Sequence, residues 1–293
     1  MTTPISFFLW REHLSKKDVA VILHTLLKRQ PLIFIGSITS AVDAYVKAAA
    51  NLLPHRNRVS YGIDVLKKEE IDEIRLTEKH NYDTPRTIVF SLSNYTPIAI
   101  RNFSTFNGWI LGVNNRDKKR ILTVMKENNN SMTIFNVDNK RVAYTTDSKK
   151  EYKFENYILE DIIKQTDIAT SRLIRIIEKK VKMPNTPFAR EILNFEEERE
   201  KIEQELLEDE ILSFVHAARR LLALLLRLKM IKEFTSENIV ISERSIIDAI
   251  GYNKAQINEL LNLINWEWNE SFYDLITRDK DQEIGDWIDS LWV

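Results

Sequence analysis

The stretch PLIFIGSITSAVDAYVKAAANLLP, Pro31 to Pro54, decides the fold of the amino-terminal half. Residues 31–35 form a short apolar run that predicts a buried strand, and Gly36 marks its end. A polar turn then leads into an alanine-rich segment that predicts a helix over 38–53, which the proline ends. A strand that runs through Gly-Ser into a helix binds phosphate in many α/β proteins, and in others it only turns a corner.

The sequence of this turn favours the structural interpretation. A phosphate loop needs glycines at both ends and a Lys-Ser/Thr pair, and a dinucleotide fingerprint needs three glycines. GSITSAVD has one glycine and no lysine, and it places Asp43 in the first helical turns. We therefore expect a strand–helix turn with Ser37 or Ser40 as the helix cap. A degenerate nucleotide-binding fold remains the weaker alternative.

The same alternation of strands and helices continues to about residue 145. Ser15 followed by Asp18 is a capping-box signature for a helix over 16–29. The further helices expected in this half cover 67–73 and 118–127, and the further strands cover 87–92, 109–113, 132–137 and 141–145. Together these elements predict an α/β domain over residues 1–150.

The remaining residues, 151–293, predict an all-α domain. Its helices are expected over 155–182, 187–211 and 212–232. Two short helices separated by a turn at Gly251 then predict a helix-turn-helix over about 242–264. The fold class is thus an α/β domain followed by a helical domain that contains a helix-turn-helix.

Composition limits the kind of protein this chain is. The 293 residues include 44% hydrophobic and 29% charged residues, as in ordinary globular proteins, and no apolar run is long enough to span a bilayer. The amino terminus lacks the pattern of a signal peptide. There is no cysteine, which excludes disulfides and thiolate metal sites and fits a cytoplasmic protein.

Charge is distributed unevenly along the chain. The formal net charge is −1, but residues 1–185 carry 30 Lys and Arg against 20 Asp and Glu, whereas residues 186–293 carry 12 against 23. A basic half can face nucleic acid, an anionic membrane, an acidic protein or the acidic half of the same chain. Neutralisation by protein is the more ordinary of these interpretations.

No catalytic or metal-binding constellation is readable. The five histidines form no HxH or HxxxH pair, and the glutamate run near residue 197 is typical of a solvated helix face. No Gly-x-Ser-x-Gly elbow is present. We therefore expect no cofactor and no metal, and the sequence favours binding of a partner over catalysis.

Two groups of residues are candidate contacts for a partner. In the helix-turn-helix they are Lys254, Gln256 and Asn258, but the surrounding acidic residues favour protein contacts over DNA. The basic half supplies a candidate partner-contact surface. Its members are Arg116, Lys118, Lys119, Arg120, Lys140, Arg141, Arg172 and Arg175.

Residues 17–145 taken together resemble the central region of a DENN domain. The order is a leucine-rich helix (VAVILHTLLKRQ), a strand ending in Gly-Ser (PLIFIGS), a helix ending in Leu-Leu-Pro, a strand GWILGV and a strand MTIFNVDNKRV. The chain departs from the family pattern at Leu53–Pro54–His55 and at Asn136–Val137–Asp138. The upstream lobe of the family is not recognisable. The positions that match, such as Gly36 and Gly112, are expected to be structural.

The resemblance implies a module that binds a small GTPase, and many proteins of the family catalyse nucleotide exchange. Exchange needs no acid, base or nucleophile in the regulator, because it rests on differential binding. The first hypothesis is therefore a non-enzymatic interaction or regulatory module for a small GTPase. The alternative is a nucleic-acid-binding protein that uses the basic half and the winged-helix-like carboxyl-terminal segment.

Overall fold

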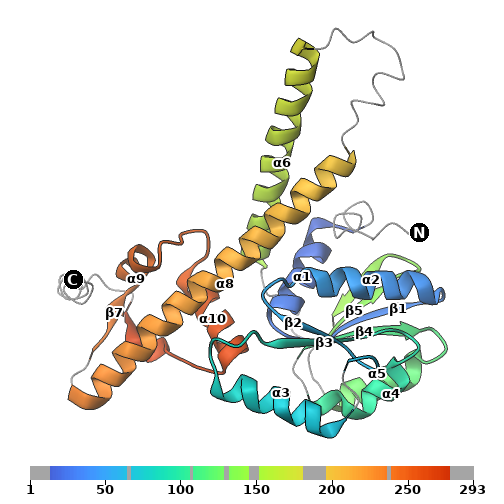
Figure 1. The fold of residues 1–293 in the computed structure, drawn as a ribbon, viewed down its shortest axis with the longest axis horizontal. Helices are drawn as coiled ribbons and strands as arrows, with labels where there is room; N and C mark the ends of the chain where they lie inside the picture. Colours follow the sequence, from blue (N-terminus) through green and yellow to red (C-terminus); the bar gives the residue numbers. More distant parts are fainter. Residues whose placement is uncertain are drawn as a thin grey trace. The chain divides into compact units, whose positions relative to one another are not determined.

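The chain is an α/β region followed by a region made mostly of helices, as predicted (Figure 1). The computed structural model describes residues 14–64, 67–105, 108–128, 132–144, 152–180, 196–235 and 239–277. It contains two compact units. The first unit comprises residues 1–78 and 85–210, and the second comprises residues 79–84 and 211–293.

A six-stranded mixed sheet forms the centre of the first unit. Its strands are β1 (Leu32–Gly36), β2 (Asn57–Ser60), β3 (Thr87–Ser91), β4 (Trp109–Asn114), β5 (Thr133–Asn136) and β6 (Arg141–Tyr144). They lie in the order β2-β3-β4-β1-β5-β6, and only β6 is antiparallel to its neighbour. The first strand is therefore central, which explains why all of its residues are buried.

Helices cover both faces of this sheet. On one face lie α1 (Lys16–Leu27) and α2 (Thr39–Asn51), and on the other lie α3 (Lys68–His80), α4 (Thr96–Ala99) and α5 (Lys118–Asn128) (Figure 1). The short 3-10 helix η2 (Ile100–Thr105) follows α4 directly. The apolar residues of β1 alternate between the two faces, so the strand contributes to both cores.

The two cores differ in composition. Ile33, Leu111 and Trp109 belong to the core beneath α3, α4 and α5. On the other face Phe34 and Phe135 pack edge to face with ring centroids 5.7 Å apart, and the ring of Tyr45 from α2 lies 5.9 Å from Phe34. These buried side chains supply the apolar area that holds the sheet between its helices.

Several local predictions for this unit are wrong in instructive ways. Neither Ser37 nor Ser40 caps α2, whose N-cap is Ile38 with no side-chain bond, because the Ser37 hydroxyl is bonded to Asp138 and Ser40 lies inside the helix. The edge strand β2 and helix α4 were not expected from the sequence. Helix α3 extends well beyond the expected end at residue 73.

Two long helices follow the sheet. Helix α6 (Lys153–Lys180) was predicted closely. Helix α8 (Glu196–Thr235) is one continuous helix, where two helices meeting at residue 211 were expected. The boundary of the two units falls within α8, after Glu210. No glycine or proline occurs near residue 211 to break the helix.

The second unit holds the predicted helix-turn-helix. Its elements besides α8 are β7 (Ile241–Ser242), α9 (Glu243–Ile250), α10 (Ile257–Trp268), η3 (Tyr273–Leu275) and β8 (Ile276–Thr277). Gly251 ends α9 with a left-handed φ of 65°, as a helix-terminating glycine does. Among the residues described, no helix is both long and apolar enough to cross a membrane.

Candidate functional site

The carboxyl ends of β1 and β4 define the place where an open α/β sheet binds ligands. These two strands are neighbours, with Gly36 paired to Asn114. The chain leaves β1 into α2 on one face of the sheet and leaves β4 into α5 on the opposite face (Figure 1). The carboxyl edge at such a reversal is the usual ligand position in this architecture.

A carboxylate of the protein itself, that of Asp138, accepts hydrogen bonds at this edge. The backbone N–H of Ser37 donates to both carboxylate oxygens of Asp138, at 3.0 Å each, and the Ser37 hydroxyl donates to Oδ1 at 3.0 Å. The side-chain amide of Asn115 donates to Oδ2 at 2.9 Å. Asp138 thus receives donors from the turns after both β1 and β4.

These bonds change the acidity of Asp138. The backbone N–H of Ser37 is the main cause that lowers the pKa of Asp138, and the side chains of Ser37 and Asn115 act in the same direction. The carboxylate is exposed, so it keeps part of its hydration. A phosphate group at this turn would have to displace an ionised side chain, which makes the turn a poor nucleotide site.

A second carboxylate ties α2 to the loop after β3. Asp43 accepts the backbone N–H of Ser93 at 2.8 Å and its hydroxyl at 2.7 Å. Gly112 of β4 lies beneath this pair, since a Cβ at that position would come within 3.0 Å of both Ser93 atoms. Both aspartates at this edge thus accept hydrogen bonds from the protein itself, and a Cβ on Gly36 or Gly112 would meet neighbouring atoms at 2.9–3.2 Å.

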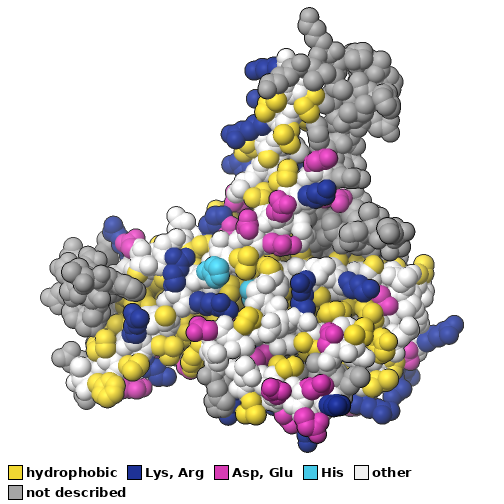
Figure 2. Space-filling model, in the orientation of Figure 1, with side chains coloured by type: hydrophobic (Ala, Val, Ile, Leu, Met, Phe, Trp, Pro, Cys, Tyr) yellow, Lys and Arg dark blue, Asp and Glu magenta, His cyan; other side chains and the backbone are white. Residues whose placement is uncertain are grey.

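Most of the predicted basic surface gathers at the same edge. Residues 116–120 follow β4, Lys140 lies in the turn from β5 to β6, and Arg141 is the first residue of β6. The side chains of Arg116, Lys118, Lys119 and Arg120 are exposed, and none forms an ion pair with any other residue that the structure describes. Lys and Arg side chains cluster at the end of the molecule where Figure 1 places α4 and α5 (Figure 2).

The other predicted cations have different environments. Lys140 donates to the hydroxyl of Tyr45 at 2.7 Å and lies 4.7 Å from the centre of its ring, so it also serves the packing of α2. Arg172 and Arg175 lie on α6 and line a groove there with Lys16 of α1. The eight residues therefore form two separate basic surfaces of the first unit.

The sequence reasoning missed apolar residues at the carboxyl edge. Ile38, Ile63 and Ile98 follow β1, β2 and β3 and are 62%, 61% and 56% exposed, and Tyr95 is 38% exposed. The loops after β2 and β3 touch, because a Cβ on Gly62 would lie 2.8 Å from the Tyr95 ring. For Ile38, a large apolar residue in the polar turn after a predicted strand was a signal, whereas Ile63 follows a strand that was not predicted.

The helix-turn-helix residues do not form one reading surface. Helix α10 begins at Ile257, so Lys254 and Gln256 lie in the turn before it. The backbone N–H of Gln256 donates to the carboxylate of Glu259 at 2.7 Å, which caps the helix. Of these three candidates, only Asn258 is an exposed residue of α10, and it carries no positive charge.

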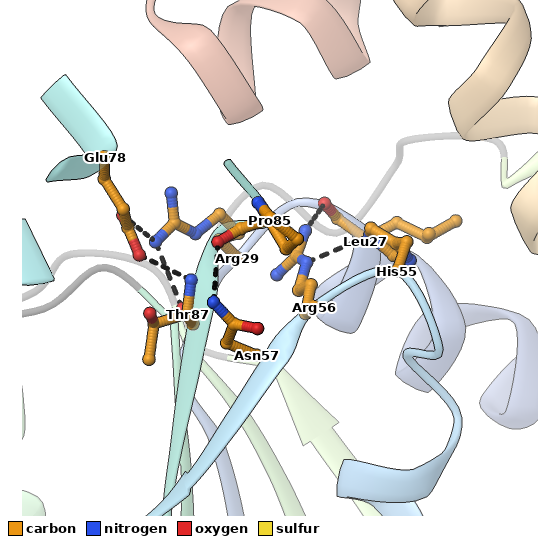
Figure 3. Close-up of polar contacts among 8 residues, drawn as sticks. All are labelled: Leu27, Arg29, His55, Arg56, Asn57, Glu78, Pro85 and Thr87. Carbon is orange, nitrogen blue, oxygen red and sulfur yellow. Dashed lines mark hydrogen bonds and ion pairs between the residues drawn. The ribbon is translucent and has the colours of Figure 1, made fainter. Parts of the chain in front are cut away.

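The opposite edge of the sheet holds a buried polar cluster (Figure 3). Glu78 accepts the guanidinium of Arg29 at 3.3 Å and the backbone N–H of Thr87. Arg29 also donates to the carbonyl oxygen of Thr87 at 3.2 Å, and Arg56 donates to that of Leu27 at 2.9 Å. These bonds join the segments that enter β1, β2 and β3, so the cluster acts in folding.

No candidate metal centre emerges within the described ranges, because no three His, Asp or Glu side chains converge there. The comparisons with known proteins add no assignment. No protein-family model matches the chain, and no curated protein or solved structure matches it either. The carboxyl-edge surface, comprising the exposed apolar residues and the cations of residues 116–120, is thus the candidate site.

Proposed function

We propose that the first unit is a protein-docking module, and that a small GTPase binds to its carboxyl-edge surface. The observation that carries the proposal is that exposed isoleucines and exposed cations occur along one edge of one sheet. Ile38, Ile63 and Ile98 are each more than half exposed there. Apolar anchors surrounded by charge are the usual composition of a protein interface.

The electrostatics of the edge favour an acidic partner. Four cations within residues 116–120 are opposed by one intervening carboxylate, Asp117. Unpaired surface charges steer a partner of opposite sign and raise the association rate. A protein partner with carboxylates around an apolar patch satisfies both features, whereas the exposed isoleucines contribute nothing to phosphate contacts with nucleic acid.

The resemblance to DENN domains supplies the class of partner. A regulator of a small GTPase binds the nucleotide-free form more tightly than the loaded form, and this difference drives nucleotide release. Such an activity requires a docking surface, and it requires no catalytic group. The proposal implies action in the cytoplasm.

Binding assays with the full chain test the proposal. Small GTPases of the source organism, prepared nucleotide-free, with GDP and with a GTP analogue, are passed over the immobilised chain. We expect one of them to bind, most tightly without nucleotide. Lys119→Glu at the start of α5 should weaken binding about tenfold, because it replaces an attraction with a repulsion.

Lys126→Glu is the matched control, since Lys126 is an exposed lysine of the same helix at its opposite end. It should leave the affinity unchanged. Absence of binding in every nucleotide state would refute the proposal. A salt-sensitive shift of duplex DNA that Lys119→Glu abolishes would instead favour a nucleic-acid partner.

A further inference from the structure

Helix α6 presents a second surface that the carboxyl edge does not involve. Along the inner face of α6, a buried side chain recurs at every fourth residue. These side chains are Phe154, Ile158, Ile162, Thr166 and Thr170. Helix α6 contacts α1, and His24 of α1 lies 2.7 Å from the carboxylate of Glu155. The position of α6 on the first unit is therefore fixed by packing.

A groove of about 750 Å³ runs along the other side of the helix. Lys16 of α1 lines it, together with residues of α6 between Glu160 and Arg175. Ile163 and Ile168 provide its apolar part, and Ile168 is 45% exposed. Fifteen residues of helix rise by about 22 Å, which is the length of about four helical turns.

The charges of the groove are unbalanced. Its two carboxylates are engaged, since Glu160 lies 3.6 Å from Lys16 and Asp167 accepts Arg199 of α8 at 2.6 Å. Within the part of the chain that the structure describes, Lys164, Arg172 and Arg175 have no ion pair or hydrogen bond. Figure 2 shows Lys and Arg side chains in a row along the exposed length of α6.

We propose that this groove binds an acidic amphipathic helix of a partner protein. The apolar side of such a helix would cover Ile163 and Ile168, and its carboxylates would pair with Lys164, Arg172 and Arg175. The length of the groove matches a helix of about 16 residues. This surface lies on different elements from the carboxyl edge, so the proposal stands independently of the proposed function.

The groove fits other partners less well. A nucleic-acid backbone would meet Glu160 and Asp167 among the cations, and it has no apolar group to cover the exposed isoleucine. A concave surface also cannot lie flat against the headgroups of a bilayer. A helix is convex and amphipathic, and it satisfies both the shape and the pattern of charge.

Fluorescence anisotropy with the full chain tests the proposal. The probe is a fluorescein-labelled peptide of about 16 residues, with leucines at positions i, i+3, i+4 and i+7 and glutamates on the opposite side. The control peptide has lysine in place of every glutamate. We expect the acidic peptide to bind and the basic peptide not to bind, with an affinity that falls as salt is raised.

Variants locate the site. The double variant Arg172→Glu with Arg175→Glu should weaken binding of the acidic peptide by about tenfold or more. The matched double reversal Lys118→Glu with Lys119→Glu on α5 should leave peptide affinity unchanged, while it weakens binding of a small GTPase. Circular dichroism of each variant checks that it is folded.

Three results would overturn the proposal. They are equal binding of the acidic and basic peptides, an affinity that the α6 reversal does not change, and displacement of the peptide by an equal concentration of duplex DNA. If the parent chain binds the acidic peptide but binds no small GTPase in any nucleotide state, only the proposed function is refuted.

Discussion

The carboxylate of Asp138 accepts the backbone N–H of Ser37, across 101 residues of sequence, and so joins the turn after β5 to the turn after β1. Both turns lie at the carboxyl edge of the sheet, near the ends of the neighbouring strands β1 and β4. The bond places an ionisable side chain of the protein itself at the turn after β1. It also makes the stability of this edge depend on the ionisation of one side chain.

Asp138→Asn should therefore lower the free energy of unfolding by about 1 kcal/mol at neutral pH, because an amide is a weaker acceptor than a carboxylate at an exposed site. The pKa of Asp138 is lower in the folded chain than in the unfolded chain. Its contribution is complete above the unfolded pKa and is lost as the pH falls through the folded pKa. Urea denaturation from neutral to acidic pH measures both effects.

As the pH falls, the free energy of unfolding of Asp138→Asn should therefore decrease less than that of the parent chain. Asp248→Asn is the control, since Asp248 is exposed on α9 and has no hydrogen bond within the described residues. It should reproduce the pH profile of the parent. A profile for Asp138→Asn that parallels the parent would show that Ser37 does not stabilise the ionised form.

Gly112→Ala should destabilise the first unit by about 1–3 kcal/mol, the usual cost of overpacking a filled site. The new Cβ would lie 3.0 Å from the backbone nitrogen and the hydroxyl of Ser93, and 3.2 Å from the carboxylate of Asp43. It would push apart the bonds that tie α2 to the loop after β3. Thermal unfolding measures the change.

Ser93→Ala in the Gly112→Ala background separates the clash of the new Cβ with the Ser93 hydroxyl from its clash with the Ser93 nitrogen. Removing the hydroxyl relieves one contact of the new Cβ but leaves the contact with the Ser93 nitrogen. We expect the double variant to lose less than the sum of the two single variants. Additive losses would contradict a steric clash at this position.

Glu78→Gln should cost about 2–4 kcal/mol, because it leaves the guanidinium of Arg29 buried without its counter-charge (Figure 3). The side chains of Arg29 and Glu78 are only 7% and 15% exposed. Replacing both, as Arg29→Met with Glu78→Met, should recover part of the loss because no charge then remains buried. Urea denaturation compares the two variants with the parent chain, and a double variant less stable than Glu78→Gln would oppose this account.

The local sequence determines β1 and α6 well because both have strong apolar patterns over their whole length. The local sequence fails to predict a contact where a residue that is distant in the sequence competes for the same hydrogen-bonding group. Ser37 has the chemistry of a helix cap, but Asp138 takes its hydroxyl, and no local pattern reveals this. The edge strand β2 contains only one buried residue, Ser60, so it lacks the alternation that marks a strand.

The candidate site was predicted only in part for the same reason. The cations of residues 116–120 could be found from their density in the sequence, whereas their position beside Ile38, Ile63 and Ile98 follows from strand order. Order is a long-range property, since β2 lies three places from β1 although it comes next in the chain. The start of α10 at Ile257 could have been predicted, because Gln256 and Glu259 have capping-box spacing.

Trp268→Phe should loosen the segment 79–84 within the second unit. The indole N–H of Trp268 donates to the carbonyl oxygen of Tyr82 at 3.0 Å, and the Tyr82 hydroxyl donates to the carboxylate of Glu270 at 2.7 Å. Phenylalanine keeps most of the buried ring and removes only the donor, so the cost is about 1 kcal/mol. Hydrogen exchange of residues 79–84 should become faster, because their opening no longer breaks this bond.

Tyr82→Phe is the matched control for that experiment. It removes the exposed bond to Glu270 and leaves the carbonyl that Trp268 binds, so its effect on exchange should be smaller. Amides of β4 in the first unit report on the specificity of the change and should exchange as in the parent. Faster exchange throughout the chain would indicate global destabilisation, and equal effects of the two variants would contradict the role assigned to the indole.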